Sequence, residues 1–77
     1  MVEVYSEVVV RLARLRAWRE RRALTQEELA KKAGITRVAL SRIETGAAEP
    51  HPRTTRALAR ALNVQVEALM DPFDESS

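Results

Sequence analysis

Two helix starts separated by one tight turn, within the stretch from Thr25 to Gly46, constrain the fold more than any other part of the sequence. Thr25 carries a hydroxyl suited to capping a helix, and Glu28, three residues later, can reach back to complete a capping box. Leu24 and Leu29 occupy the flanking positions at which apolar side chains pack across a helix entrance. The sequence therefore predicts a helix that begins at Thr25.

A second helix follows almost at once. Gly34 stands where a helix end needs a left-handed residue, and Thr36 can cap the next helix. Only Gly34 and Ile35 separate the last residue of the first helix from the cap of the second. A connection this short forces the two helices to cross.

The second helix has a buried side and an outward side, because successive side chains advance about 100° around a helix. Leu40 and Ile43 define the buried side. The outward side carries Val38 and Arg42, with Ser41 and Thr45 beside them and Arg37 on the flank. Glu44 falls back toward the core, where a carboxylate needs a partner.

The stretch resembles the helix-turn-helix of the lambda-repressor and Cro-like (XRE-type) DNA-binding family. Gln26, Leu29, Ala30, Gly34 and Leu40 match the first, fourth, fifth, ninth and fifteenth positions of the family motif. The resemblance extends from about residue 15 to residue 70, through the segments WRERRALTQ and LARALNV. It implies an all-α, compact five-helix DNA-binding domain.

Composition agrees with a small all-α domain and limits its chemistry. The chain has 77 residues, 4% aromatic residues and no cysteine, which excludes disulfides and thiolate metal sites. Its longest apolar runs, such as Val8 to Val10, have only three residues, far fewer than the roughly 20 of a membrane span or the roughly 7 of a secretory signal. We expect a cytoplasmic protein without cofactor, metal or membrane contact.

The net charge of +2 conceals a strongly basic block. Residues 11–42 carry ten basic side chains against three acidic ones, whereas residues 1–10 and 43–77 are both net acidic. Arginines often do no more than solvate an exposed helix, so the charge alone leaves that interpretation open. Its coincidence with the helix-turn-helix favours a nucleic-acid partner, whose phosphates attract such a surface.

The sequence divides into an arm, a domain and a tail. We expect residues 1–6 to form an N-terminal arm, residues 7–71 the helix-turn-helix domain, and residues 72–77 a flexible acidic tail. Ser6 can cap a first helix from about Glu7 to Arg22. The arm itself is compatible with a short strand or with an extension of this helix, and we hypothesise that its apolar residues support self-association.

The remaining helices follow from local signals. Pro52 suits the first turn of a helix that runs to Leu62, and Asn63 can end it in a left-handed conformation. This helix is expected to bury Leu58, Ala61 and Leu62. A short helix from Val66 to Met70 is expected to complete the domain. His51 lies between two prolines with no catalytic motif around it, so no catalytic or metal-binding role is expected for it.

The family resemblance also implies roles for single residues. It pairs Arg19 with Glu44, which supplies the partner that the inward carboxylate needs. It places Ala23 in a turn position where the family commonly has glycine, so a positive φ there would strain the alanine by about 1 kcal/mol. The loop after Gly46 often carries basic residues in the family but is uncharged at Ala47 and Ala48 and acidic at Glu49, which implies weaker binding or a narrower footprint.

By the same resemblance, the second helix of the motif enters the major groove of double-stranded DNA. The candidates for contacts with base edges are Arg37, Val38 and Arg42, because arginine can bind guanine bidentately and valine can pack on a thymine methyl. The candidates for contacts with the DNA backbone are Gln26, Thr36, Ser41, Thr45 and Arg53.

We therefore expect a sequence-specific transcriptional regulator, of the repressor or controller type, that acts as a homodimer on a near-palindromic operator. Leu69, Met70 and Phe73 are the candidates for the dimer interface, although Leu69 is more suited to closing the core. The alternative is an antitoxin-like protein that neutralises a protein partner and autoregulates its own operon. An enzyme is not expected, because the sequence has no nucleophile elbow, phosphate loop or metal-ligand spacing.

Overall fold

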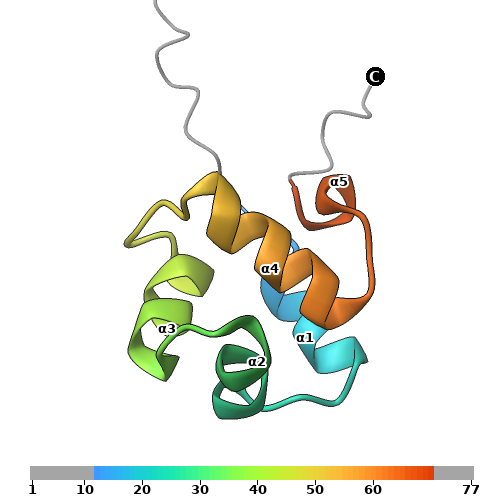
Figure 1. The fold of residues 1–77 in the computed structure, drawn as a ribbon, viewed down its shortest axis with the longest axis horizontal. Coiled ribbons are helices and arrows are strands. Elements are labelled where there is room, and N and C mark those ends of the chain that lie inside the picture. The colour runs from blue at the N-terminus through green and yellow to red at the C-terminus, as the bar shows by residue number, and fades with distance from the viewer. Residues whose placement is uncertain (1–11, 71–77) are drawn as a thin grey trace, which may run out of the picture.

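The computed structural model describes residues 12–70, in which five helices form an all-α bundle, as the sequence predicts. The helices are α1 (Leu15–Arg21), α2 (Gln26–Ala33), α3 (Arg37–Thr45), α4 (Pro52–Leu62) and α5 (Val66–Leu69). Figure 1 shows α4 crossing the middle of the molecule, with α2 and α3 at one end and α5 at the other. The arm of residues 1–6 and the tail of residues 72–77 lie outside the described residues.

A single leucine-rich core holds the helices together. Each helix contributes at least one fully buried leucine: Leu15, Leu29, Leu40, Leu58, Leu62 and Leu69. In α4 the buried residues are Thr55, Leu58, Ala59 and Leu62, whereas Ala61 is only partly buried. The expected burial of Ala61 is thus only partial, because the buried stripe of α4 follows the i, i+3, i+4, i+7 pattern from Thr55 and leaves Ala61 packed at its edge.

The first helix begins later than the sequence suggested. We expected it to run from about Glu7, but residues 12–14 form a turn and α1 starts at Leu15. The backbone amide of Arg14 donates to the carbonyl of Leu69 at 3.1 Å. That amide is thus engaged by α5 and cannot make the hydrogen bond that a helix continuing from Glu7 would require.

Four helices end in the same way, and each ending uses one left-handed residue. Among residues 12–70, positive φ angles occur at Ala23, Gly34, Gly46 and Asn63, which follow α1, α2, α3 and α4. The next residue donates its amide to a carbonyl five positions back, as in the bonds of Leu24 to Arg19, Ile35 to Ala30, Ala47 to Arg42 and Val64 to Ala59. This is the Schellman closure, which satisfies the last carbonyls of a helix and turns the chain sharply.

One side chain of α1 and one of its C-cap residue fasten this helix to the C-terminal half of the domain. The indole Nε1 of Trp18 donates to the carbonyl of Ala68 at 2.9 Å, and Nε of Arg22 donates to the carbonyl of Leu62, also at 2.9 Å. The predicted last helix ends at Leu69, with Met70 as its extended C-cap. No helix within residues 12–70 has the length and apolar character needed to cross a membrane.

Candidate nucleic-acid interface

The helix-turn-helix is built by the local signals that the sequence carries. Thr25 Oγ1 accepts from the amide of Glu28 at 3.0 Å, and the Glu28 carboxylate accepts from the amide of Thr25 at 2.8 Å. Gly34 closes α2 with φ +77°, and Thr36 Oγ1 accepts from the amide of Ala39 at 3.0 Å to cap α3. The axes of α2 and α3 are therefore set by hydrogen bonds at both sides of the two-residue turn.

The outward face of α3 presents an apolar side chain between two cations. Val38 is 59% exposed and is the one large hydrophobic side chain so exposed among residues 12–70. Arg37 and Arg42 are exposed on either side of it, while Leu40 and Ile43 are buried on the opposite face. The structure thus brings the three side chains predicted to contact bases onto one solvent-facing surface.

A buried ion pair locks α3 to α1. Arg19 Nε donates to Glu44 Oε2 at 2.6 Å, and its Nη2 donates to Oε1 at 3.1 Å, with the side chains only 11% and 3% exposed. The hydrogen bonds to Glu44 raise the pKa of Arg19 above its ordinary value, although burial opposes the shift. Two parallel bonds in a site shielded from water hold both side chains in one orientation.

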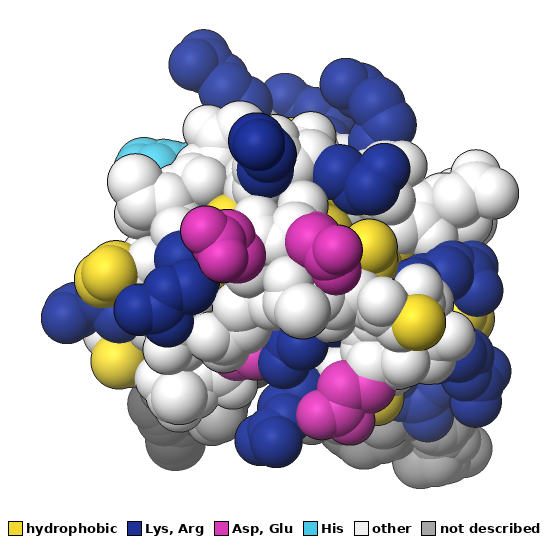
Figure 2. All heavy atoms as spheres, turned by 90° about the horizontal axis from the view of Figure 1, so that it is seen from below, with side chains coloured by type: hydrophobic (Ala, Val, Ile, Leu, Met, Phe, Trp, Pro, Cys, Tyr) yellow, Lys and Arg dark blue, Asp and Glu magenta, His cyan; other side chains and the backbone are white. Residues whose placement is uncertain are grey.

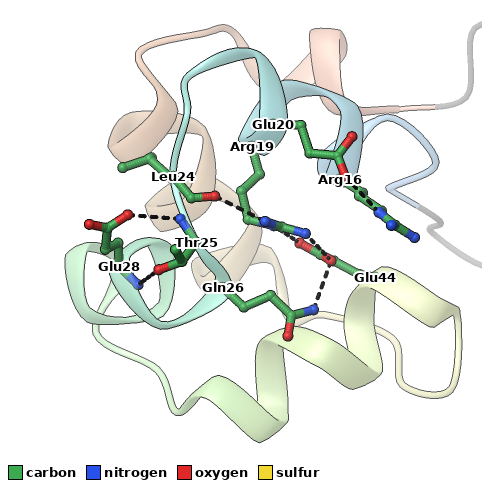
Figure 3. A network of polar contacts seen from close by, with 8 residues as sticks. All are labelled: Arg16, Arg19, Glu20, Leu24, Thr25, Gln26, Glu28 and Glu44. Atoms are coloured by element: carbon green, nitrogen blue, oxygen red, sulfur yellow. Dashed lines mark hydrogen bonds and ion pairs between the residues drawn. The ribbon is translucent and has the colours of Figure 1, made fainter.

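The Glu44 carboxylate also orients Gln26, a residue predicted to contact the DNA backbone. Gln26 Nε2 donates to Glu44 Oε1 at 3.0 Å, so the amide at the start of α2 is fixed against α3 (Figure 3). Arg19 Nη1 further donates to the carbonyl of Leu24 at 2.9 Å, in the segment that leads into α2. Glu44 therefore joins α1, α2 and α3 in one polar network.

Beside this network lies a polar cleft of about 560 Å³ between α1, the start of α2 and α3. Its lining residues are Arg16, Arg19, Thr25, Gln26, Glu27, Arg37, Glu44 and Thr45. Amides at a helix start and nearby arginines are the groups that bind phosphate oxygens. The cleft therefore has the chemistry of a DNA-backbone site.

Sequence reasoning missed Arg16 as a member of this cleft. Arg16 lies three residues before Arg19, on the same side of α1, and its Nε donates to the exposed carboxylate of Glu20 at 3.0 Å. The sequence did carry a signal for this position of Arg16. Residues three apart share one side of a helix, and Arg19 was predicted to pair with Glu44 of α3.

The other residues predicted to contact the DNA backbone are Thr36, Ser41 and Thr45, which lie at or along α3, and Arg53, which lies on α4. Thr36 is exposed at the start of α3, where its oxygen caps the helix and its O–H proton stays available. Thr45 is exposed and donates to the carbonyl of Arg42 at 3.2 Å, while Ser41 is half-buried. Arg53 is exposed in the first turn of α4 and does not line the cleft.

Basic side chains surround the face formed by α2 and α3. Figure 2 views the molecule from this side and shows Lys and Arg side chains mostly around the edge of the face, with carboxylates nearer its middle. After α3, the amides of Ala47 and Ala48 both donate to the carbonyl of Arg42, at 2.8 and 3.1 Å. The loop there folds back onto α3 and adds no cation to the face.

Comparison with known proteins agrees with this geometry. The family model described as "Helix-turn-helix domain" matches residues 12–73, most of the chain. The chain belongs to this helix-turn-helix family. Its fold is that of the lambda-repressor-like DNA-binding domains, as the sequence resemblance implied.

Two relatives of this helix-turn-helix protein are named as transcription regulators. It is 46% identical over 57 residues to the HTH-type transcriptional repressor RghR of Bacillus subtilis, a match that covers 73% of this chain and 42% of RghR. It is 39% identical over 62 residues to an uncharacterized HTH-type transcriptional regulator of Archaeoglobus fulgidus, covering 80% of this chain and 89% of that protein. The chain thus spans under half the length of RghR and most of the archaeal regulator.

A solved structure extends the likeness to a protein bound to DNA. The P22 c2 repressor in complex with synthetic operator 9T is 33% identical to this chain, with a TM-score of 0.71. The match covers 75% of this chain and 88% of the repressor chain in that structure. The relatives and solved structures of this family thus include named transcription regulators and a repressor bound to a synthetic operator.

Proposed function

We propose that this helix-turn-helix protein regulates transcription by binding as a homodimer to a near-palindromic operator in double-stranded DNA. In this proposal α3 enters the major groove, and Arg37, Val38 and Arg42 contact base edges. The observation that carries the proposal is the exposed Val38 between two exposed arginines, on a helix whose other face is buried in the core. This combination suits the major groove, because arginine can bind guanine bidentately and valine can pack on a thymine methyl.

The cleft beside α3 supports contacts with the DNA backbone. Gln26 is held at the start of α2 by Glu44 and retains a second N–H on its amide for a phosphate oxygen. Arg16 adds a cation at the rim of the same cleft, while Thr36, Ser41 and Thr45 lie along α3. Arg53 contributes from the start of α4. These contacts position the protein on DNA without selecting a sequence.

A dimer follows from the small size of this interface. One α3 helix contacts too few base pairs for useful specificity, whereas two copies related by a two-fold axis contact two half-sites about 34 Å apart. The P22 c2 repressor, with the same fold, binds an operator, which supports the same class of target for this chain.

The decisive experiment is selection of bound sequences from random duplexes at a stated salt concentration, because affinity for DNA depends strongly on salt. We expect an enriched near-palindrome with half-sites about one helical turn apart. A matched selection with Arg42→Ala should relax the preference at one position in each half-site. Recovery of unrelated sequences with no shared motif would contradict the proposed function.

A further inference from the structure

The side of α1 that faces away from the DNA cleft carries a basic surface built around one indole. Two guanidinium groups lie near the indole of Trp18, with the central carbon of Arg21 at 5.0 Å and that of Arg22 at 4.9 Å from the ring centroid. A pocket of about 340 Å³ beside the ring is lined by Arg14, Ala17, Trp18 and Arg21. We call the surface made by Arg14, Trp18, Arg21 and Arg22 the tryptophan–arginine face.

This face holds three cations without a carboxylate partner inside the described part of the chain. The ion pairs within residues 12–70 are Arg16–Glu20 and Arg19–Glu44, and neither involves the face. Two guanidinium groups beside a single ring attract an anion that can approach both of them. The charge of the face therefore suits an acidic ligand.

The DNA proposed above does not explain these cations. Arg16, which lines the DNA cleft, lies two residues from Trp18 and five from Arg21 on α1. At about 100° per residue, Trp18 and Arg21 point roughly 160° and 140° away from Arg16 around the helix. DNA bound in the cleft is thus on the opposite side of α1.

An acidic segment of the same chain begins next to this face. Residues 71–77, DPFDESS, contain three acidic residues, no basic residue and one phenylalanine. The residues just before them are bonded to the face, through Arg14 N to Leu69 O at 3.1 Å and Trp18 Nε1 to Ala68 O at 2.9 Å. Seven residues extend over about 23 Å, which is enough to cross a single helix.

We propose that the tryptophan–arginine face is the docking surface for residues 71–77 of the same chain. The segment has the complementary chemistry: the acidic residues Asp71, Asp74 and Glu75 for the three arginines, and the apolar Phe73 for the pocket beside Trp18. Docking ties the end of α5 to α1 through side chains in addition to the two backbone carbonyls. The inference concerns the side of the domain remote from DNA, so it stands or falls independently of the operator proposal.

A double-mutant cycle on the full chain tests this docking. One variant carries Asp71→Asn, Asp74→Asn and Glu75→Gln, a second carries Arg21→Gln, and a third combines all four changes. We expect the acidic-segment variant to melt about 2 to 4 °C lower at low salt, and the difference to shrink near 1 M salt, where the Debye length is about 3 Å. In the Arg21→Gln background the same acidic changes should have clearly less effect.

A matched control and an independent signal accompany the cycle. Lys31→Gln removes a cation from α2, so the acidic changes should act at full strength in that background. Trp18 is the single tryptophan of the chain, and its quenching by acrylamide should increase when the acidic segment is neutralised. Additive melting shifts with Arg21→Gln, or unchanged quenching, would overturn the proposal. Coupling that appears only at high protein concentration would also overturn it, because the segment would then dock on a second copy.

Discussion

Ala23 holds a backbone conformation that suits glycine better than alanine. Its φ is +58°, and it ends α1 in a Schellman closure. A left-handed conformation costs a residue with a Cβ roughly 1–2 kcal/mol, a cost that glycine avoids. Glycine is also freer in the unfolded chain, which offsets part of this gain in stability. We therefore expect Ala23→Gly to stabilise the fold by about 1 kcal/mol and to raise Tm by about 4 °C.

Thermal melts followed by circular dichroism check this prediction. Ala17→Gly is the matched control, because Ala17 is exposed in the interior of α1 and helical glycine costs about 1 kcal/mol. The two identical replacements should shift Tm in opposite directions. A lower Tm for both variants would mean that the turn carries no strain.

The Arg19–Glu44 ion pair is the second residue-scale feature with a measurable consequence. Glu44 is 3% exposed, so loss of its partner leaves a carboxylate buried beside the core. Breaking a buried pair by removing one partner costs about 3 kcal/mol or more, and we expect a loss of this size for Arg19→Met in urea denaturation. Arg16→Met breaks the exposed pair with Glu20 and should cost under about 0.5 kcal/mol. Equal losses for the two variants would contradict a special role for burial.

At the scale of elements, the sequence predicted the parts whose signals are local. The capping box at Thr25, the glycine at residue 34 and the cap at Thr36 lie within a few residues of the bonds that they make, so α2, the turn and α3 followed directly. The start of α1 did not, because it depends on a bond from Arg14 to Leu69, 55 residues later. Membership of Arg16 in the cleft likewise depends on how α1 packs beside α3.

The proposed base contact of Arg42 in α3 and the proposed phosphate contact of Gln26 in α2 can be told apart by mutation. If Arg42 binds a base bidentately, Arg42→Ala should cost about 1 to 3 kcal/mol on the operator and relax the preference at one position of each half-site. Gln26→Ala should weaken binding to all sequences alike, since Gln26 is held at the start of α2 for a phosphate contact. Binding measured on operators with single base-pair changes separates the two patterns. Equal losses on every operator for Arg42→Ala would refute its proposed contact with a base.

The position of Arg16 in the cleft predicts a change in salt dependence. One phosphate contact contributes about 0.9 to the slope of log K against log salt on double-stranded DNA. We expect Arg16→Gln to reduce the slope by about that amount per protomer. Arg60→Gln is the control, because Arg60 is an exposed arginine of α4 that does not line the cleft. An identical slope for Arg16→Gln and the unmodified protein would remove Arg16 from the interface.

At the scale of the whole molecule, the candidates for the proposed dimer interface separate by burial. Leu69 is fully buried and closes the core, as the sequence suggested, so it cannot meet a second copy. Met70 is half-buried and lines an apolar pocket of about 380 Å³ together with Pro50, Pro52 and Val66. Phe73 lies outside the described residues. Met70 is therefore the described residue whose replacement tests the proposed interface most directly.

A charge at Met70 should separate the two copies without unfolding either, because its side chain lies at the edge of the core. We expect Met70→Glu to sediment as a monomer and to lose at least about tenfold in affinity for an operator with two half-sites, equivalent to about 1.4 kcal/mol. Its affinity for an isolated half-site should be unchanged, since α3 is untouched. Gln65→Glu adds the same charge at the exposed N-cap of α5 and should leave the dimer intact. A dimeric Met70→Glu protein that still prefers paired half-sites would place the interface elsewhere on the domain.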